Sequence, residues 1–138
     1  MKLLLDTNVV LDYMLQRQPN YEYCRKIINR AIDNDDYEII SASAITDIFY
    51  IAKRQGRDSY DVQDAITDLL DLVHAASITE DDIRTALKLK WKDFEDAVQY
   101  AVAIANGADY IISSNKKDFD GAQIPVLTPE EFYTTHEP

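Results

Sequence analysis

The chain has 138 residues, of which 46% are hydrophobic and only three are glycine, so it is long enough for a single domain over residues 1–138 and is not expected to be disordered. Its net charge of −11 at pH 7 weighs against a protein that binds nucleic acid mainly through overall attraction to phosphates. The same charge is compatible with an enzyme that acts on nucleic acid through bound divalent cations.

Hydrophobic periodicity predicts strands and helices that alternate along the chain. In chain order, the predicted elements are a strand at 2–5, helices at 9–15 and 24–31, a strand at 38–42, helices at 45–52 and 62–73, a weak strand at 74–78, helices at 81–89 and 96–105, strands at 110–112 and 124–127, and a short helix from 129. Pro19 and Asn20 separate the first two helices, and Asn106 and Gly107 end the helix at 96–105.

Three polar residues are expected to begin helices as N-caps. Ser43 precedes one helix, Thr79 precedes another with Asp82 three residues later, and Thr128 precedes Pro129 as the first residue of the last helix.

The first fifteen residues are apolar apart from Asp6, Asn8 and Asp12 in their middle. These interruptions exclude a signal peptide or a membrane span there, so no membrane association is expected. The single cysteine, Cys24, cannot form an internal disulfide, and a reducing cytoplasm is the expected location.

Strands that alternate with helices favour a parallel sheet that is covered on both faces. We therefore predict an α/β fold with three layers, α/β/α, around a central parallel sheet of about four to five strands. In such sheets, binding sites form beyond the carboxyl ends of the strands.

Several polar side chains stand where this fold would gather its loops. Asp6 directly follows the first strand, and Asp96 lies in the first turn of an alanine-rich helix that can approach the sheet closely. Asp47 is expected in the first turn of the helix after the second strand, pointing away from its apolar face. Asn115 and Asp118 follow the fourth strand.

Carboxylates that converge at one edge of a sheet repel one another unless a cation neutralises them. Oxygen ligands without a cysteine or histidine pair indicate Mg²⁺ or Mn²⁺ rather than zinc.

The alternative is that first-turn aspartates such as Asp47 or Asp96 only stabilise a helix dipole. Asp93 and Glu95 are interpreted as an N-cap and a solvated first-turn acid. The acids beside the helix at 62–73 are interpreted as a solvated face: Asp61, Asp64, Asp68 and Asp71.

Four stretches of the sequence resemble, in order, the four motifs of the PIN-domain family. The first is the hydrophobic strand of residues 3–5 with Asp6-Thr7-Asn8 and the returning Asp12, and the others are residues 41–48, 93–97 and 111–119. The resemblance runs from Lys2 to Phe132, which is nearly the whole chain. It implies the PIN fold and the activity of VapC-type toxins, which are metal-dependent ribonucleases.

The resemblance also implies which residues form the metal-bound acidic cluster. Asp6, Asp47 and Asp96 correspond to the core acids, although Asp47 stands where the family more often has glutamate, one methylene longer. The fourth acidic position corresponds either to Asn115 or to Asp118.

The remaining implied roles concern support, substrate and mechanism. Asn8, with Thr7 beside it, corresponds to the part of the first motif that steadies the site by hydrogen bonds. One or two Mg²⁺ or Mn²⁺ ions would activate a water for hydrolysis of an RNA phosphodiester bond, with one carboxylate accepting a proton. Lys116 and Lys117 either bind the RNA backbone or are solvated loop lysines. A second basic cluster more simply complements a helix dipole: Lys53, Arg54 and Arg57.

Three alternatives remain beside a nuclease. A phosphatase of the haloacid-dehalogenase type needs an aspartate where Asn8 stands. A receiver-like signalling domain needs an acidic pair after the first strand and a phosphoacceptor aspartate after the third, and neither is evident. The third alternative is a catalytically inactive PIN fold that acts as a partner-binding module.

The resemblance to toxins of toxin–antitoxin pairs implies two protein partners besides the RNA substrate. These are a cognate antitoxin and a second copy of the chain in a homodimer. Four side chains are a candidate surface for such a partner, although core packing explains them equally well: Tyr13, Met14, Tyr21 and Tyr23.

Overall fold

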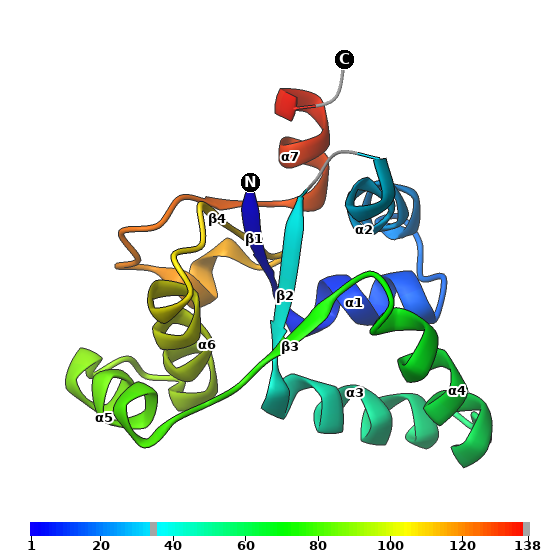
Figure 1. The fold of residues 1–138 in the computed structure, drawn as a ribbon, viewed down its shortest axis with the longest axis horizontal. Coiled ribbons are helices and arrows are strands. Elements are labelled where there is room, and N and C mark those ends of the chain that lie inside the picture. The colour runs from blue at the N-terminus through cyan, green and yellow to red at the C-terminus, as the bar shows by residue number, and fades with distance from the viewer. Residues whose placement is uncertain (34–35, 137–138) are drawn as a thin grey trace.

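A sheet of five parallel strands lies at the centre of the protein, whose residues 1–33 and 36–136 are described by a computed structural model. The strands lie in the order β3-β2-β1-β4-β5, and Figure 1 labels the first four of these. They are β1 (Lys2–Leu5), β2 (Tyr37–Ser41), β3 (His74–Ala76), β4 (Tyr110–Ile112) and β5 (Val126–Leu127). The predicted parallel sheet is therefore confirmed.

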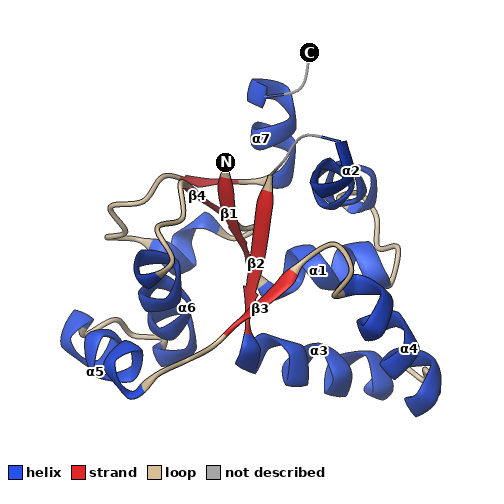
Figure 2. Ribbon diagram, in the orientation of Figure 1, coloured by secondary structure: helices blue, strands red, loops and turns tan. Residues whose placement is uncertain are grey.

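Helices cover both faces of this sheet (Figure 2). On one face lie α1 (Thr7–Met14), α2 (Tyr21–Asp33), α3 (Ala42–Arg54), α4 (Ser59–Leu69) and α7 (Pro129–His136). On the other lie α5 (Glu80–Leu89), α6 (Phe94–Ala105) and the short 3-10 helix η1 (Lys116–Phe119). Successive strand residues point to opposite faces, so Leu3 and Leu5 enter one core and Leu4 enters the other. The predicted α/β/α layering is confirmed.

The register of the sheet determines which residues meet at its carboxyl edge. Leu5 of β1 pairs with Ile112 of β4, and the backbone N–H of Asp6 donates to the Ile112 carbonyl at 2.9 Å. The residues that follow these two strands, Asp6 and Ser113, are therefore neighbours.

The start of α3 differs from the prediction. Strand β2 ends at Ser41, and Ser41 itself, with extended backbone, is the N-cap of a helix that begins at Ala42. The predicted cap at Ser43 is wrong, because Ala42 and Ala44 are strong helix formers and the helix extends back over them. Asp47 is consequently the sixth residue of α3 and lies in its second turn rather than its first.

The other predicted caps agree with the structure. Thr79 and Asp82 form a reciprocal capping box, with hydrogen bonds of 2.9 and 3.2 Å. Thr128 accepts a hydrogen bond from the backbone of Glu131 in α7. Some elements are shorter than predicted, since α4 ends at Leu69, and β3 and β5 each cover only part of their predicted ranges.

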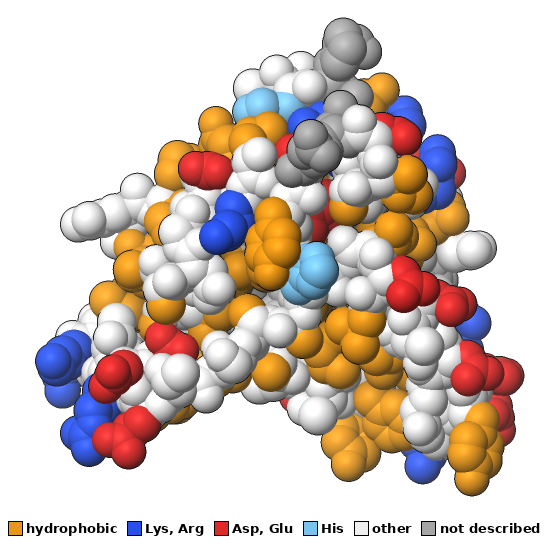
Figure 3. Space-filling view, in the orientation of Figure 1, with side chains coloured by type: hydrophobic (Ala, Val, Ile, Leu, Met, Phe, Trp, Pro, Cys, Tyr) orange, Lys and Arg blue, Asp and Glu red, His pale blue; other side chains and the backbone are white. Residues whose placement is uncertain are grey.

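The outer surface agrees with the solvated face expected for α4. The four acids expected on this face, three within α4 and Asp71 just after it, are all exposed: Asp61, Asp64, Asp68 and Asp71. Figure 3 shows acidic side chains along the outer side of this helix. Tyr13 and Met14 pack against the core, which favours the core-packing interpretation for these two residues. Among the described residues, no helix combines the length and the apolar character needed to cross a membrane.

Candidate functional site

Asp6 lies at the carboxyl edge of the sheet, directly after β1. The buried strand β1 ends at Leu5, so the next side chain is held at the sheet rim, where Asp6 is only 4% exposed. Its Oδ1 accepts hydrogen bonds from the backbone N–H of Thr7 at 2.8 Å and from Nε2 of Gln99 at 3.1 Å. Its Oδ2 accepts one from Oγ of Ser113 at 2.8 Å. Three donors on three segments therefore fix the orientation of this carboxylate.

Sequence reasoning missed two of these donors, Gln99 and Ser113. Gln99 follows Asp96 by three residues on α6, and it is the polar member of an otherwise apolar buried run from Ala97 to Ala103. A polar residue in such a run was the available signal. Ser113 directly follows β4, and its proximity to Asp6 depends on the pairing of β4 with β1, which is a long-range contact.

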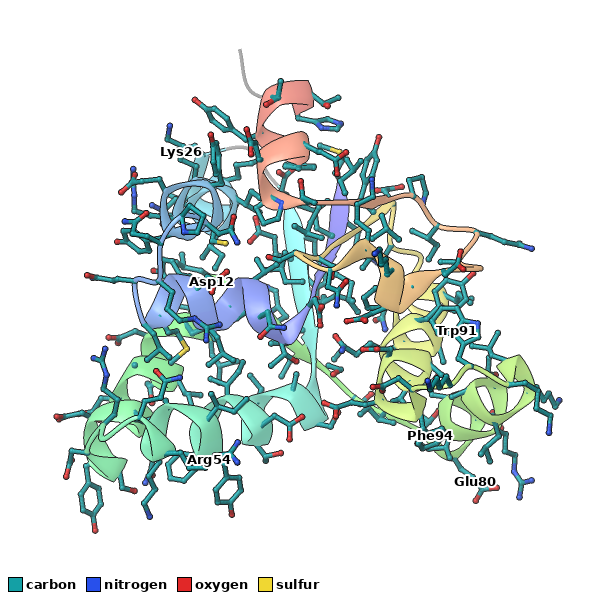
Figure 4. All side chains as sticks on the ribbon, turned by 180° about the vertical axis from the view of Figure 1, so that it is seen from behind. Asp12, Lys26, Arg54, Glu80, Trp91 and Phe94 are labelled. Carbon is teal, nitrogen blue, oxygen red and sulfur yellow. The ribbon has the colours of Figure 1, made fainter. Side chains whose placement is uncertain are left out.

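A hollow of about 370 Å³ opens above Asp6 and collects most of the predicted site residues. It lies between the N-terminal part of α6 and α3; Figure 4 labels Phe94 and Arg54 on these two helices. Its walls are formed by Asp6, Thr7, Asn8, Asp47, Tyr50, Ile51, Arg54, Asp93, Glu95, Asp96, Gln99 and Asp118. Arg54, which the sequence assigned to dipole complementation, and Tyr50 are among the wall residues that were not predicted.

Asp96 faces Asp6 from the first turn of α6. The N-cap Asp93 accepts a hydrogen bond from the Asp96 backbone N–H at 3.1 Å, which fixes the start of the helix and agrees with the predicted cap. Partial burial and the negative charges of Asp93, Asp118 and Asp6 raise the pKa of Asp96 to about 7. Burial, Asp6 and Asp93 also raise the pKa of Asp118. These acids are close enough to disfavour one another's charge.

Glu95 and Asp47 form a second pair across the hollow. A hydrogen bond with Asp47, partial burial and the charges of Asp47, Asp93 and Asp96 raise the pKa of Glu95 to about 7. Glu95 is an exposed acid in the first turn of α6, as predicted, but it also lines the hollow, because α6 turns this side chain toward Asp47 of α3. Asp47 is shorter than the glutamate of the related motif, and Glu95 reaches it from the other side.

Asn115 and Asp118 occupy different positions at the fourth motif. Asp118 lines the hollow, whereas Asn115 does not. Instead, Asn115 donates from Nδ2 to Oδ1 of Asp118 at 3.0 Å, and its backbone N–H donates to Oγ of Ser113 at 3.0 Å. Asn115 thus links the residue that orients Asp6 to the acid on the opposite wall.

The two lysines of the fourth motif also differ. Nζ of Lys116 forms an exposed ion pair with Glu131 at 3.2 Å, and Lys116 lines no hollow beside the acids. Lys117 lines a second hollow, next to Asp96 and Asp118. Asp12, the returning acid of the first motif, pairs with Arg17 at 2.8 Å and takes no part in the hollow.

The donor atoms around the hollow suit a hard divalent cation. The side chains supply carboxylate oxygens, and two further buried oxygens, Oγ1 of Thr7 and Oε1 of Gln99, have no hydrogen-bond partner among the described residues. Oxygen-only donors with several negative charges are the ligand set of Mg²⁺ and Mn²⁺. Within residues 1–33 and 36–136, no three acids already surround one point at ligand distance. Mg²⁺ is commonly held by one or two carboxylates together with waters, so this donor set still fits it.

The fold and this acidic edge agree with a family match. The sequence pattern of the PIN domain matches residues 2–117, and the chain belongs to the PIN-domain family. The resemblance seen in the four motifs is thereby confirmed.

Individual relatives extend this match over the chain. Ribonuclease VapC1 of Aquifex aeolicus (strain VF5) is 30% identical over 139 residues, covering 95% of this chain and 92% of that protein. VapBC-1 from nontypeable Haemophilus influenzae has a similar structure, with a TM-score of 0.71 and 18% identity over 94% of this chain and 99% of that one. A toxin–antitoxin complex from Klebsiella pneumoniae gives a TM-score of 0.69 with 23% identity, over 92% of this chain and 97% of that one. At these identities, the two structures establish the shared fold.

Proposed function

We propose that this PIN-domain ribonuclease hydrolyses RNA phosphodiester bonds with one or two divalent cations, Mg²⁺ or Mn²⁺, bound beside Asp6. The observation that carries the proposal is the position of Asp6, which three donors hold at the floor of a hollow whose walls contribute Asp47, Asp96 and Asp118. The similarity to a relative named as a ribonuclease supports RNA as the substrate.

The proposed ligands are Asp6, Asp96 and Asp118, with Asp47 on the facing helix. Of the two candidates for the fourth position, the geometry supports Asp118 as the acid and Asn115 as the residue that positions it. When bound, a divalent cation lowers the pKa of a coordinated water and stabilises negative charge on the leaving oxygen.

The chain's own residues provide orientation and proton transfer. Ser113, Gln99 and the Thr7 backbone hold the Asp6 carboxylate in one orientation, as outer partners of metal ligands commonly do. Glu95, hydrogen-bonded to Asp47, is the candidate to accept the proton of the attacking water. Arg54 and Asn8 line the same hollow, where they can donate hydrogen bonds to phosphate oxygens.

The first test is cleavage of a structured and an unstructured RNA by purified protein in Mg²⁺, in Mn²⁺ and in chelator. We expect cleavage with metal only, and none from an Asp6→Asn, Asp96→Asn double variant purified identically. A matched control is Asp64→Asn, Asp68→Asn, which removes the same charge from the exposed face of α4 and should leave cleavage unchanged.

Two results separate the nuclease from its main alternative. A folded wild type that neither cuts RNA nor binds Mn²⁺ in calorimetry would contradict the proposal and support an inactive, partner-binding PIN fold. Equal cleavage by the double variant would show that a contaminating nuclease is responsible.

We further propose that the chain is the toxin of a toxin–antitoxin pair, so that a cognate antitoxin is its protein partner. The names of the similar proteins support this, since one similar structure is a toxin–antitoxin complex. Co-expression with a cognate antitoxin should yield a stable complex that no longer cuts RNA. Homodimerisation, a cytoplasmic location and a single domain over residues 1–138 stay predictions.

A further inference from the structure

A second hollow adjoins the acidic one and has a different character. Its volume is about 520 Å³, in the range of pockets that hold a small ligand. It shares Asp93, Asp96 and Asp118 with the first hollow. Its other walls are Trp91, Lys92, Lys117 and Asp120, so Trp91 is its single aromatic and single apolar side chain among the residues that the structure describes. A single strand of nucleic acid that reaches the acids from this side would pass over Trp91.

Trp91 is partly exposed and held in place from behind. Its indole stacks on the ring of Tyr100, with 4.9 Å between centroids and 22° between planes, and meets Phe119 edge-on at 6.2 Å. Tyr100 is itself buried, and its hydroxyl accepts a hydrogen bond from the backbone of Gln123 at 2.9 Å. In Figure 4, Trp91 lies beside α6, on the side of the sheet away from α1. The indole is therefore a rigid surface rather than a mobile side chain.

We propose that Trp91 is a stacking platform for an unpaired base of the RNA, next to the phosphate that is cut. The identity of the ligand rests on the proposed nuclease function. Lys92 and Lys117 flank the platform, and neither has an ion-pair partner among the described residues, so both can contact the phosphates on either side of the stacked base.

Electrostatics explains why RNA binding at this hollow has to depend on an aromatic side chain rather than on attraction to phosphates. The chain carries a net charge of −11, and four of the seven residues that line the second hollow are aspartates. Attraction to phosphates, which dominates most binding of nucleic acid, is therefore weak here. Stacking of a base on an aromatic ring does not depend on charge and tolerates any sequence. A base inside a duplex has neighbours on both faces, so only an unpaired base can use Trp91.

Trp91 is the only tryptophan in the chain, so its fluorescence reports on this position alone. The probes are single-stranded hexaadenylate and a duplex of matched length, added to the Asp6→Asn, Asp96→Asn variant, which leaves the RNA uncut. We expect quenching of the indole emission by the single strand, protection of the indole from acrylamide, and a much smaller response to the duplex. At saturating RNA, the quenching should change little with added salt, because stacking does not depend on charge.

Variants measure how much the platform contributes to binding. In the same background, fluorescence anisotropy of labelled hexaadenylate should show roughly ten-fold weaker binding for Trp91→Leu, and an intermediate loss for Trp91→Phe. The matched control is Phe94→Leu, an exposed aromatic at the start of α6 that lines neither hollow, and it should bind as before. Because Trp91→Leu also removes packing on Tyr100, thermal melts accompany it. If Trp91→Leu does not fold, the affinity of Trp91→Phe and the quenching of the Trp91 emission test the platform instead.

The outcomes separate this proposal from the nuclease itself. Bound RNA without any change of the indole emission, or unchanged affinity of a folded Trp91→Leu variant, would overturn the platform even if wild-type protein cuts RNA. Quenching by RNA in a protein that never cuts it would leave the platform standing and remove the nuclease. Quenching by an arginine-containing peptide but not by RNA would overturn the platform and assign the hollow to a protein partner.

Discussion

Two buried carboxyl side chains, Asp6 just after β1 and Glu38 in the adjacent strand β2, lie toward opposite ends of the sheet and in opposite chemical settings. Asp6 follows β1 and accepts hydrogen bonds from three donors within 3.1 Å. Glu38 lies near the start of β2, opposite Leu3, with a relative exposure of 0%. Neither of its carboxyl oxygens has a hydrogen-bond partner among the described residues. Burial alone therefore does not make a site.

The two ends of the sheet explain this difference. At the carboxyl edge, the first turns of helices and the loops after strands offer N–H and hydroxyl groups. At the amino edge, Glu38 lies on the same face of β2 as Ile40, which belongs to the core that α2 and α7 cover. The nearby Arg30 is engaged by Asp36 at 2.6 Å and lies over the ring of Phe132. Burial and the charge of Asp36 raise the pKa of Glu38 to about 9, against the lowering effect of Arg30. Glu38 is thus a neutral acid at pH 7.

The largest expected effect comes from removing the charge of Asp6. Asp6→Asn keeps the shape of the side chain, so the fold should survive, because the Ser113 hydroxyl can rotate to accept from the new amide. Loss of a metal ligand should lower the rate of RNA cleavage by at least about a hundred-fold, more than the loss of an outer partner usually does. Timed RNA-cleavage assays measure the rate, and calorimetry measures Mn²⁺ binding, with Asp68→Asn as the control. Retained Mn²⁺ binding would contradict the role assigned to Asp6.

Glu38 should affect stability rather than activity. Its pKa of about 9 in the folded state exceeds the ordinary value of 4.5, so the folded chain binds one more proton between these two pH values. The stability this provides is fully present below about pH 4.5 and is lost as the pH rises through about 9. Glu38→Gln removes the titration. Relative to wild type, its free energy of unfolding should rise by about 1.4 kcal/mol per pH unit over this window.

Urea denaturation at several pH values between these limits measures that difference. Glu130→Gln, an exposed acid on α7, serves as the control and should follow the wild-type curve. Parallel curves for wild type and Glu38→Gln would show that Glu38 is solvated or paired in solution. Cleavage by Glu38→Gln at pH 7 should match that of wild type, since Glu38 lines neither hollow.

Removing the donors around Asp6 should leave its carboxylate with fewer hydrogen-bond partners, as is the case for Glu38. Ser113→Ala deletes the hydroxyl that donates to Asp6 and accepts from Asn115, and Gln99→Leu deletes the amide. Each should lower Mn²⁺ affinity or the cleavage rate by roughly 10- to 100-fold, as is common for outer partners of metal ligands. Calorimetry and cleavage assays report this, with Gln63→Leu on the exposed side of α4 as the control. Unchanged metal affinity in both variants would mean that Asp6 needs no support.

Local sequence was sufficient to place Asp6 and Asp96, because each follows directly from an element boundary. An apolar run ending in aspartate sets the first, and a capped alanine-rich helix sets the second. The parallel sheet and its layers followed in the same way from the alternation of short patterns. Asp47 was assigned to the wrong turn because two alanines allow α3 to begin earlier than its serine cap suggested.

What could not be predicted depends on contacts between distant segments. Ser113 meets Asp6 only through the register of β1 with β4, and Glu95 meets Asp47 only because α6 and α3 face each other across the hollow. Glu38 was read as an ordinary first residue of a strand, since nothing local signals that its oxygens would lack partners. In each case, the missing information is the identity of the neighbour, which a single strand or helix does not contain.

The smallest expected effect extends the same comparison to the surface, where Lys116 has a partner and Lys117 has none that the described residues supply. Lys116→Ala breaks an exposed pair with Glu131, so it should change the free energy of unfolding by less than about 1 kcal/mol and leave RNA affinity unchanged. Lys117→Ala removes a cation from the wall of the second hollow and should weaken RNA binding a few-fold at low salt, with the difference disappearing as salt screens it. Anisotropy titrations at two salt concentrations compare the adjacent lysines under identical conditions. Equal losses for both would mean that their charge counts only through the overall field of the protein, and that the ion pair with Glu131 does not withhold Lys116 from the RNA.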